Sequence, residues 1–268
     1  MQRFATLAVA VVFMLGAAAS ASANVMLFAD TFDRPDNTDL NASTAGKSGS
    51  LGAMDWVQLG GGGGMEIASN ELKGGDNGAA AGWAVSYPDH NFVDAVIASG
   101  GGFSVSIDLL NYATAGSGRW LAIVVGHSKA EIDAWSTNNG ASTVSDLFVG
   151  YRWTQKQLEV YDNGALVAEP GISSYPVPQT MRVDYALSDF NAGSTVNYEA
   201  YLGSDLITSG SFTWSGTNEN YIGIFTNLSA RQARMDNLEI SYVPEPATLA
   251  LLSIGGLGLV IRRRRVRA

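Results

Sequence analysis

The sequence predicts an all-β protein, an antiparallel two-sheet sandwich of the jelly-roll type. Short apolar runs with strand-like alternation recur along the central part of the chain, turn residues separate them, and no window there sustains a helical period. The 268 residues include 31 glycines, a usage that favours turn-rich β structure. Many short strands at this spacing are typical of sandwiches and jelly rolls.

Eight runs carry the strand prediction most clearly. They are Phe103–Ile107, Leu121–Val125, Leu147–Trp153, Leu158–Tyr161, Met181–Tyr185, Val196–Tyr201, Tyr221–Phe225 and Leu238–Tyr242. The clearest hairpin joins the run that ends at Tyr161 to Ala165–Val167, because Asn163 and Gly164 accept the positive φ that tight hairpin turns require. We expect roughly a dozen strands in all.

The N-terminus reads as a secretion signal over residues 1–23. A single positive charge at Arg3 precedes an apolar run from Phe4 to Ala19, and the small residues Ala21–Ala23 follow it. This order of charge, apolar run and small residues is what signal peptidase cleaves. We therefore expect signal peptidase to cut after Ala23 and the mature chain to begin at Asn24.

The C-terminus, residues 243–268, has three parts. Val243–Pro246 is followed by an apolar stretch, Ala247–Ile261, which we expect to be a single transmembrane helix, and by a basic tail over residues 262–268. The apolar stretch is shorter than the roughly 17 to 25 residues of a stable spanning helix, which suits a temporary anchor. Arginines beside such a span stay in the cytoplasm, so the body lies outside the inner membrane. The stop-transfer arginines are Arg262, Arg263, Arg264 and Arg265, with Arg267 beyond them.

This tail resembles the PEP-CTERM sorting signal of Gram-negative bacteria that make extracellular polysaccharide. The resemblance implies that an exosortase, a membrane-embedded processing enzyme, recognises Pro244, Glu245 and Pro246 and removes the tail. The protein would then be exported, anchored transiently in the inner membrane, and passed to the cell surface or extracellular matrix. The two prolines bar helix and hold this segment extended, which suits an enzyme's substrate.

Between the two signals lies one predicted domain, residues 24–242. Six of the 16 basic and one of the 25 acidic residues lie in the ends, which leaves the body with 10 basic and 24 acidic residues and a net charge of −14. A surface of this sign repels nucleic acid and anionic lipid but admits neutral polysaccharide or a divalent cation. The chain has no cysteine, so disulfides, thiol nucleophiles and thiolate metal sites are excluded.

A second resemblance covers the body. The opening Asp30–Leu40, then Trp56, then Ile67–Leu72, and the closing Arg234–Ile240 look like bacterial laminin-G-like or concanavalin A-like domains. The resemblance implies a two-sheet jelly roll that binds glycans and sometimes holds calcium at a rim. It does not imply catalysis.

Calcium is the cofactor that the acidic opening suggests. Calcium takes six to eight oxygen ligands, and the opening supplies several aspartates. In jelly rolls of the type it resembles, a calcium site can form where the first strand meets the last, which would bring Asp30 toward Asp236. The alternative is that these acids keep a sheet edge from aggregating.

Aromatic side chains are the candidate glycan ligands, since their faces stack on the apolar faces of sugar rings. Most of the six tryptophans and ten tyrosines must belong to the core. Trp135 is the one we expect to be least core-like, because a polar Ser-Thr-Asn-Asn-Gly segment follows it. It is therefore the candidate glycan-binding residue.

An enzymatic alternative rests on Glu131. Concanavalin A-like glucanases carry Glu-x-Asp-x-x-Glu on a strand, where two carboxyl groups about 5 Å apart perform retaining hydrolysis. Here Ser136 stands where the second glutamate should be, so we expect no catalytic residue. Three functions stay open: a non-enzymatic module that binds extracellular polysaccharide, a glycan hydrolase using Glu131 and a second, unrecognised acid, and a passive structural surface protein.

Overall fold

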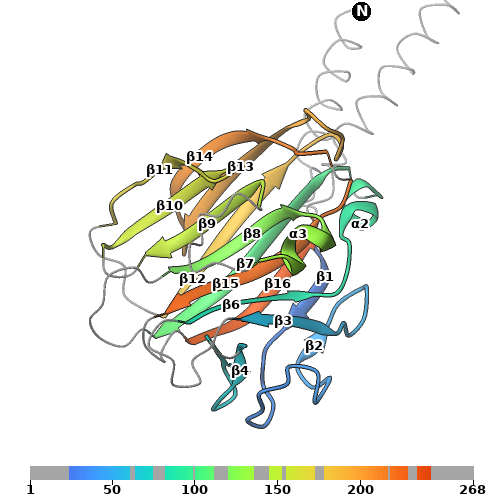
Figure 1. The fold of residues 1–268 in the computed structure, drawn as a ribbon, viewed down its shortest axis with the longest axis vertical. Coiled ribbons are helices and arrows are strands. Elements are labelled where there is room, and N and C mark those ends of the chain that lie inside the picture. Colours follow the sequence, from blue (N-terminus) through green and yellow to red (C-terminus); the bar gives the residue numbers. More distant parts are fainter. Residues whose placement is uncertain are drawn as a thin grey trace, which may run out of the picture. The chain divides into compact units, whose positions relative to one another are not determined.

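Two antiparallel sheets lie face to face (Figure 1). The computed structural model describes residues 24–60, 64–74, 82–98, 100–111, 120–135, 145–152, 155–172, 178–216, 218–228 and 234–242. Residues 26–242 form one compact unit. The predicted antiparallel two-sheet sandwich is confirmed. The exact domain bounds, 24 and 242, stay a prediction.

Sheet A, the larger sheet, is built around long central strands. Its strands in spatial order are β14 (Asp205–Thr213), β13 (Thr195–Leu202), β12 (Gln179–Ala186), β7 (Gly102–Asn111), β16 (Arg234–Tyr242), β1 (Val25–Asp30) and β2 (Lys47–Ser48). Two short strands extend it beside β16, namely β5 (Leu72–Lys73) and its partner β4 (Glu66–Ile67). The first and last strands of the body, β1 and β16, are therefore neighbours.

Sheet B lies in front of sheet A in Figure 1. Its strands in spatial order are β11 (Ala165–Ala168), β10 (Gln157–Asp162), β9 (Leu147–Arg152), β8 (Trp120–His127), β15 (Tyr221–Leu228), β6 (Gly82–Pro88) and β3 (Trp56–Gly60). Two short helices, α2 (Val93–Ala98) and α3 (Lys129–Asp133), follow β6 and β8 in the chain.

The clearest strand predictions are confirmed. Seven of the eight runs lie within β7, β8, β10, β12, β13, β15 and β16, and the eighth lies in β9 except for Trp153, which is outside the described residues. The predicted hairpin joins β10 to β11, with φ of 45° at Asn163 and 80° at Gly164. Two short helices, α2 and α3, also occur in the body, and at six and five residues they are too short to give a sustained helical period in the sequence.

Side-chain alternation explains how the two sheets share a core. In β13, buried residues such as Val196, Tyr198 and Ala200 alternate with exposed neighbours, as expected for a strand with one face on the core. Sheet B differs, because β8 is buried at every position from Trp120 to His127. Sheet B is therefore covered on both faces over β8, which positions the site described below.

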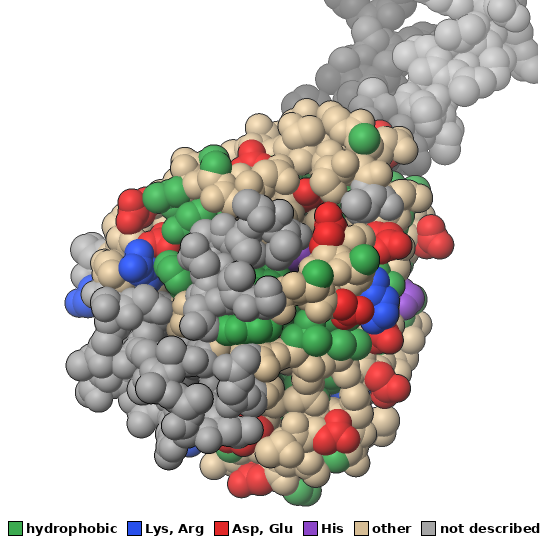
Figure 2. All heavy atoms as spheres, viewed as in Figure 1, with side chains coloured by type: hydrophobic (Ala, Val, Ile, Leu, Met, Phe, Trp, Pro, Cys, Tyr) green, Lys and Arg blue, Asp and Glu red, His purple; other side chains and the backbone are tan. Residues whose placement is uncertain are grey.

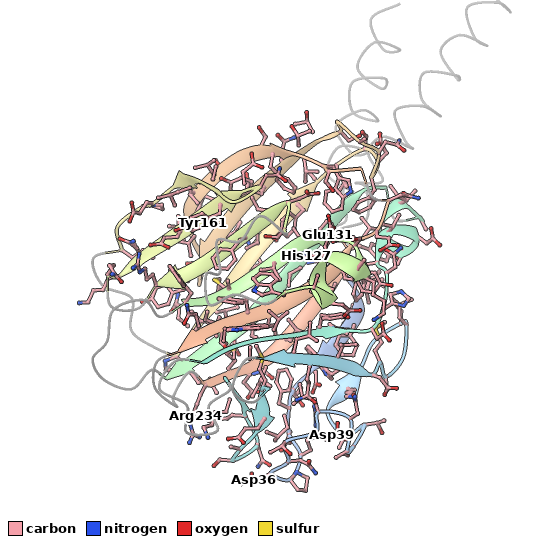
Figure 3. All side chains as sticks on the ribbon, viewed as in Figure 1. Asp36, Asp39, His127, Glu131, Tyr161 and Arg234 are labelled. Carbon is pink, nitrogen blue, oxygen red and sulfur yellow. The ribbon has the colours of Figure 1, made fainter. Side chains whose placement is uncertain are left out.

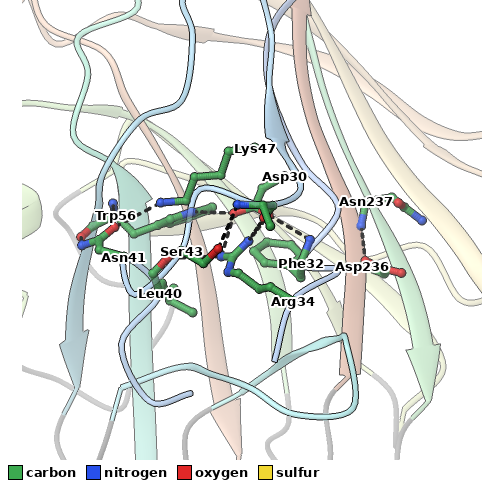
Figure 4. A network of polar contacts seen from close by, with 11 residues as sticks. Asp30, Phe32, Arg34, Leu40, Asn41, Ser43, Lys47, Trp56, Asp236 and Asn237 are labelled. Carbon is green, nitrogen blue, oxygen red and sulfur yellow. Dashed lines mark hydrogen bonds and ion pairs between the residues drawn. The ribbon is translucent and has the colours of Figure 1, made fainter. Parts of the chain in front are cut away.

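A buried ion pair fixes the opening segment to the sandwich (Figure 4). The Arg34 guanidinium donates to both carboxylate oxygens of Asp30 at 2.6 and 3.0 Å, and the two side chains are 2% and 0% exposed. The same carboxylate accepts from the Trp56 indole at 2.8 Å and from the backbone N–H of Phe32 at 2.8 Å. Arg34 also donates to the carbonyl of Ala45 at 3.0 Å. These bonds compensate the desolvation of the two charges.

The two predicted signals lie outside the described residues. Residues 1–23 include the predicted secretion signal, and residues 243–268 include the predicted membrane span at 247–261. Among the described residues, no helix is both long and apolar enough to cross a membrane. The secretion signal and the membrane span therefore stay predictions.

Removal of Arg34 should destabilise the body more than removal of an ordinary surface cation. Arg34→Ala leaves the Asp30 carboxylate buried without its counter-charge, and we expect it to lower the free energy of unfolding by about 3–5 kcal/mol. The matched control is Lys73→Ala, because the partly exposed pair of Lys73 and Glu66 should contribute at most about 1 kcal/mol. Urea unfolding measures both. Equal losses would show that the Asp30–Arg34 pair is not the main constraint on the opening segment.

Candidate functional site

The face of sheet B that points away from sheet A is apolar and rich in aromatic side chains. We call it the aromatic face. Its described members are Val57, Leu59, Trp83, Val85, Tyr87, Trp120, Ala122, Val124, Phe148, Tyr161, Tyr221 and Phe225. Figure 2 shows hydrophobic side chains in a band across the middle of this side of the molecule. Most of these side chains are buried, while Tyr161 and Tyr221 are partly exposed at its margins.

Strand parity generates this face. In β8, Leu121, Ile123 and Val125 point into the core between the sheets, so the even-numbered residues point outward. Small residues leave room for large rings. A Cβ on Gly150 would lie 2.5 Å from the Phe148 ring, so that position admits only glycine while the ring stays in place. The sequence signal for this face was the unbroken apolar run from Trp120 to Val125 in β8, which lacks polar residues at both parities.

A chain of ring contacts crosses the face. Phe148 contacts Tyr161 edge-on at 5.6 Å between centroids and Phe225 at 5.7 Å. Trp135 stacks on Phe225 at 5.1 Å with an interplanar angle of 26°. The expectation that Trp135 is the least core-like tryptophan is corrected, because it is 4% exposed where the chain after α3 folds back over sheet B. Glycan contact through Trp135 stays a prediction.

Glu159 organises a polar cluster at one end of the aromatic face. Its carboxylate is 1% exposed and accepts from four side chains. The donors are Trp120 Nε1 at 2.6 Å, Arg152 Nη1 at 2.7 Å, Gln157 Nε2 at 2.5 Å and Tyr161 Oη at 3.1 Å. The Arg152 guanidinium also lies 4.9 Å from the centroid of the Trp120 ring. Sequence reasoning missed this cluster, although Gln157, Glu159 and Tyr161 share one parity of β10.

Electrostatics keep this cluster charged but locally balanced. Burial alone would raise the pKa of Glu159, but hydrogen bonds from Arg152, Gln157 and Trp120 outweigh it and hold the pKa below its ordinary value. Burial, together with the charge of Glu159, raises the pKa of Tyr161 to about 12. The cluster therefore offers the neutral Tyr161 phenol and the Arg152 guanidinium beside aromatic rings, while the Glu159 carboxylate is buried and holds them in place. These groups can bind hydroxyl-rich ligands but include no activated nucleophile.

Asp146 lies at the start of β9, the end of that strand opposite to Arg152 and the Glu159 cluster. It immediately precedes β9, is 2% exposed, and accepts from the backbone N–H of Ser215 at 2.8 Å. Burial raises its pKa to about 6; the Ser215 hydrogen bonds oppose this shift, while the charges of Glu131 and Asp162 add to it. Gly126, at φ 79°, makes room for Asp146, since a Cβ there would lie 2.4 Å from the Asp146 Cβ.

Helix α3 uses Glu131 structurally. The Glu131 carboxylate accepts from the backbone N–H and the hydroxyl of Ser128, which completes a capping box. The helix is fixed to sheet B by Lys129, whose ammonium lies 3.1 Å from the Tyr87 hydroxyl and 3.0 Å from an Asp89 oxygen. Glu131 therefore lies on a helix, where the sequence motif of glucanases requires a strand. Figure 3 shows it near His127 and apart from Tyr161.

The two candidate calcium ligands have different partners. Asp30 ends β1 and is occupied by Arg34, Trp56 and Phe32, whereas Asp236 in β16 accepts from the backbone N–H of Asn237 at 2.9 Å (Figure 4). Burial raises the pKa of Asp236. Across the described ranges, no group of three or more histidine, aspartate and glutamate side chains is placed to hold a metal ion. Calcium binding by Asp30 and Asp236 stays a prediction.

An open pocket of about 390 Å³ lies away from the aromatic face. Its lining residues are Asp36, Asn37, Thr38, Glu66, Ile67 and Ala68. Asp36 accepts from the backbone N–H of Ser69 at 2.7 Å, and Glu66 is paired with Lys73 at 2.5 Å. Figure 3 places Asp36 and Asp39 at the lower end of the view, far from Glu131. Both acids of this pocket therefore have internal partners.

Comparison with known families confirms the sorting tail. Residues 243–265 match the PEP-CTERM protein-sorting motif. The match includes Pro244, Glu245, Pro246 and the arginines from Arg262 to Arg265, all outside the described residues. No curated protein matches the sequence.

Solved structures confirm the two-sheet sandwich fold. A point mutant of the Emp46p carbohydrate recognition domain superposes with a TM-score of 0.52 at 10% identity, covering 70% of this chain and 88% of that one. The metal-free exoplasmic/lumenal domain of VIP36 superposes with a TM-score of 0.50 at 9% identity, covering 72% and 87%. At such low identity the likeness shows the fold alone.

Asp146→Asn should flatten the pH dependence of stability. The pKa of Asp146 is raised from 3.8 to about 6 in the folded protein, so ionisation opposes folding. This penalty is absent below pH 3.8, grows up to about pH 6 and is complete above it. The free energy of unfolding of the variant, relative to the unmodified protein, should therefore rise between these pH values. Chemical unfolding at a series of pH values measures it, and a constant difference would contradict the burial of an ionised Asp146.

Proposed function

We propose that this protein is an exported, exosortase-processed protein of the Gram-negative cell surface or extracellular matrix, and that its sandwich binds glycan without catalysis. Signal peptidase would remove residues 1–23. The span at 247–261 would hold the chain in the inner membrane until exosortase acts at Pro244, Glu245 and Pro246. The observation that carries the binding proposal is the partly exposed Tyr161 beside the Glu159–Arg152 pair at the margin of the aromatic face.

The chemistry of this margin suits a sugar. A tyrosine ring offers a face for the C–H side of a pyranose, while guanidinium and amide groups pair with hydroxyls. Arg152 and Glu159 keep each other's charge balanced, so the margin itself does not select a charged ligand. The body's net charge of −14 favours neutral polysaccharide over acidic polymers.

Sheet A supplies a contrast within the same molecule. Its outer face carries a network of polar pairs, including Ser104 with Asp184 at 2.7 Å and Thr180 with Asp108 at 2.5 Å. Tyr201 on this face lies under the Arg182 guanidinium, 4.2 Å from the ring centroid. Tyr201, a partly exposed ring on sheet A, is therefore available as a control for Tyr161.

The hydrolase alternative finds no support at Glu131. Its carboxylate caps α3. The charge of Glu131 contributes to the raised pKa of Asp146, but Asp146 is buried and accepts a hydrogen bond from Ser215. Retaining or inverting hydrolysis requires two carboxyl groups on either side of an open sugar site. A passive surface protein, which is processed but binds no glycan, is the alternative that binding experiments decide.

Tyr161→Ala should weaken retention on the producer's matrix polysaccharide by roughly 3- to 10-fold, because one aromatic stacking contact is lost. Tyr161→Phe keeps the ring and should retain most of the binding. Pull-down of the purified body on the polysaccharide, followed by titration calorimetry, measures both.

Tyr201→Ala is the matched control and should bind as the unmodified protein does. Equal loss in Tyr161→Ala and Tyr201→Ala would place the binding elsewhere. No retention of the unmodified body on any glycan, with or without calcium, would leave only the passive role. Glycan binding that requires calcium and that Asp236→Asn abolishes would support the candidate calcium site.

Processing should depend on both the motif and the enzyme. In a host that makes extracellular polysaccharide, the intact mass should show loss of the tail, and the body should leave the inner-membrane fraction. Glu245→Ala or deletion of the exosortase should keep the full tail and the membrane location. An uncut, membrane-bound product in every strain would indicate a permanently anchored periplasmic domain instead.

A further inference from the structure

The sorting motif follows directly on an internal strand of sheet A. β16 ends at Tyr242, and the matched motif begins at residue 243. β16 is hydrogen-bonded to β7 on one side and to β1 on the other, so neither edge is free. In the sequence, Val243 alone separates the last paired residue of the body, Tyr242, from Pro244, so their Cα atoms are at most about 7 Å apart.

The final residues of β16 are held both in the sheet and in the core. Their partners in the β7 ladder are Val105 for Ile240, Ser104 for Ser241 and Phe103 for Tyr242. Ile240 is fully buried and Ser241 is 3% exposed, whereas Tyr242 is partly buried and packs against the core from outside. Resistance to opening therefore increases from Tyr242 inward to Ile240.

An enzyme that binds an extended peptide uses the backbone N–H and C=O groups of consecutive residues, and these must be free of other partners. On the body side of Pro244, the described strand β16 runs up to Tyr242. Ser241 and Tyr242 can enter an enzyme groove only after they leave their partners in β7. Strand ends open at lower free energy than the centres of strands, so this opening does not require unfolding of the body.

We propose that the fold of the body limits the processing of its own tail, and that exosortase engages the motif fully only when Ser241 and Tyr242 have detached from sheet A. This rests on the proposed sorting function and adds a dependence on local opening of β16. Removal of the tail breaks one peptide bond, whose carbonyl carbon passes to water or to an amine acceptor while the tail leaves with a new amino terminus. Opening governs access to that bond and leaves the chemistry unchanged.

A linker between body and motif tests this. Insertion of about six glycine and serine residues between Tyr242 and Val243 supplies free backbone without altering β16 or the motif. Processing in the exosortase-producing host should become roughly tenfold faster, the factor that one or two net backbone hydrogen bonds represent. Pulse-chase labelling with intact mass analysis of the full chain measures the rate.

The matched control carries the same insertion after Gly193, an exposed turn residue between β12 and β13 with open space around it, and should be processed at the unmodified rate. Equal or slower processing of the linker variant, still dependent on exosortase, would overturn this inference alone. Absence of exosortase-dependent processing in every variant would overturn the sorting function and this inference together. Acceleration by both insertions would also overturn it, because the effect would then not depend on the spacing to β16.

Discussion

The burial of strand β8, at the centre of sheet B, on both of its faces is the constraint on which the rest of this structure depends. Side chains of a strand alternate between faces, so a strand covered on both sides must be apolar at nearly every position. β8 meets this requirement from Trp120 to Val125. The same constraint places Gly150 under the Phe148 ring and directs Trp120 toward Glu159. A sandwich with an ordinary polar outer face on sheet B would have no aromatic face.

The strands were predictable where alternation is regular, and the polar networks were not. The repeats in β12 and β13 and the Asn163–Gly164 turn carry local signals that survive in the fold. β14 was missed because its small polar residues give little hydrophobic contrast. α2 and α3 were missed because five or six residues do not establish a helical period.

Site residues depend on long-range neighbours that the sequence does not display. The acidic opening and the resemblance to jelly rolls suggest Asp30 as a calcium ligand, but its hydrogen bonds from Arg34 and Trp56 could not be predicted from the sequence. In the sequence Glu131 resembles half of a catalytic pair, but in the fold it forms a capping box with Ser128 at the start of α3. The sorting motif could be recognised from local residues, because motif, apolar stretch and arginines are contiguous in the sequence.

The central claim, that glycan binds at the margin of the aromatic face, is tested most directly by hydrogen–deuterium exchange of the body with and without matrix polysaccharide. The account predicts slower exchange in β9 and β10, which carry Arg152, Glu159 and Tyr161, and unchanged exchange in β12 to β14 of sheet A. Protection confined to sheet A, or none under conditions where the polysaccharide is bound, would contradict it.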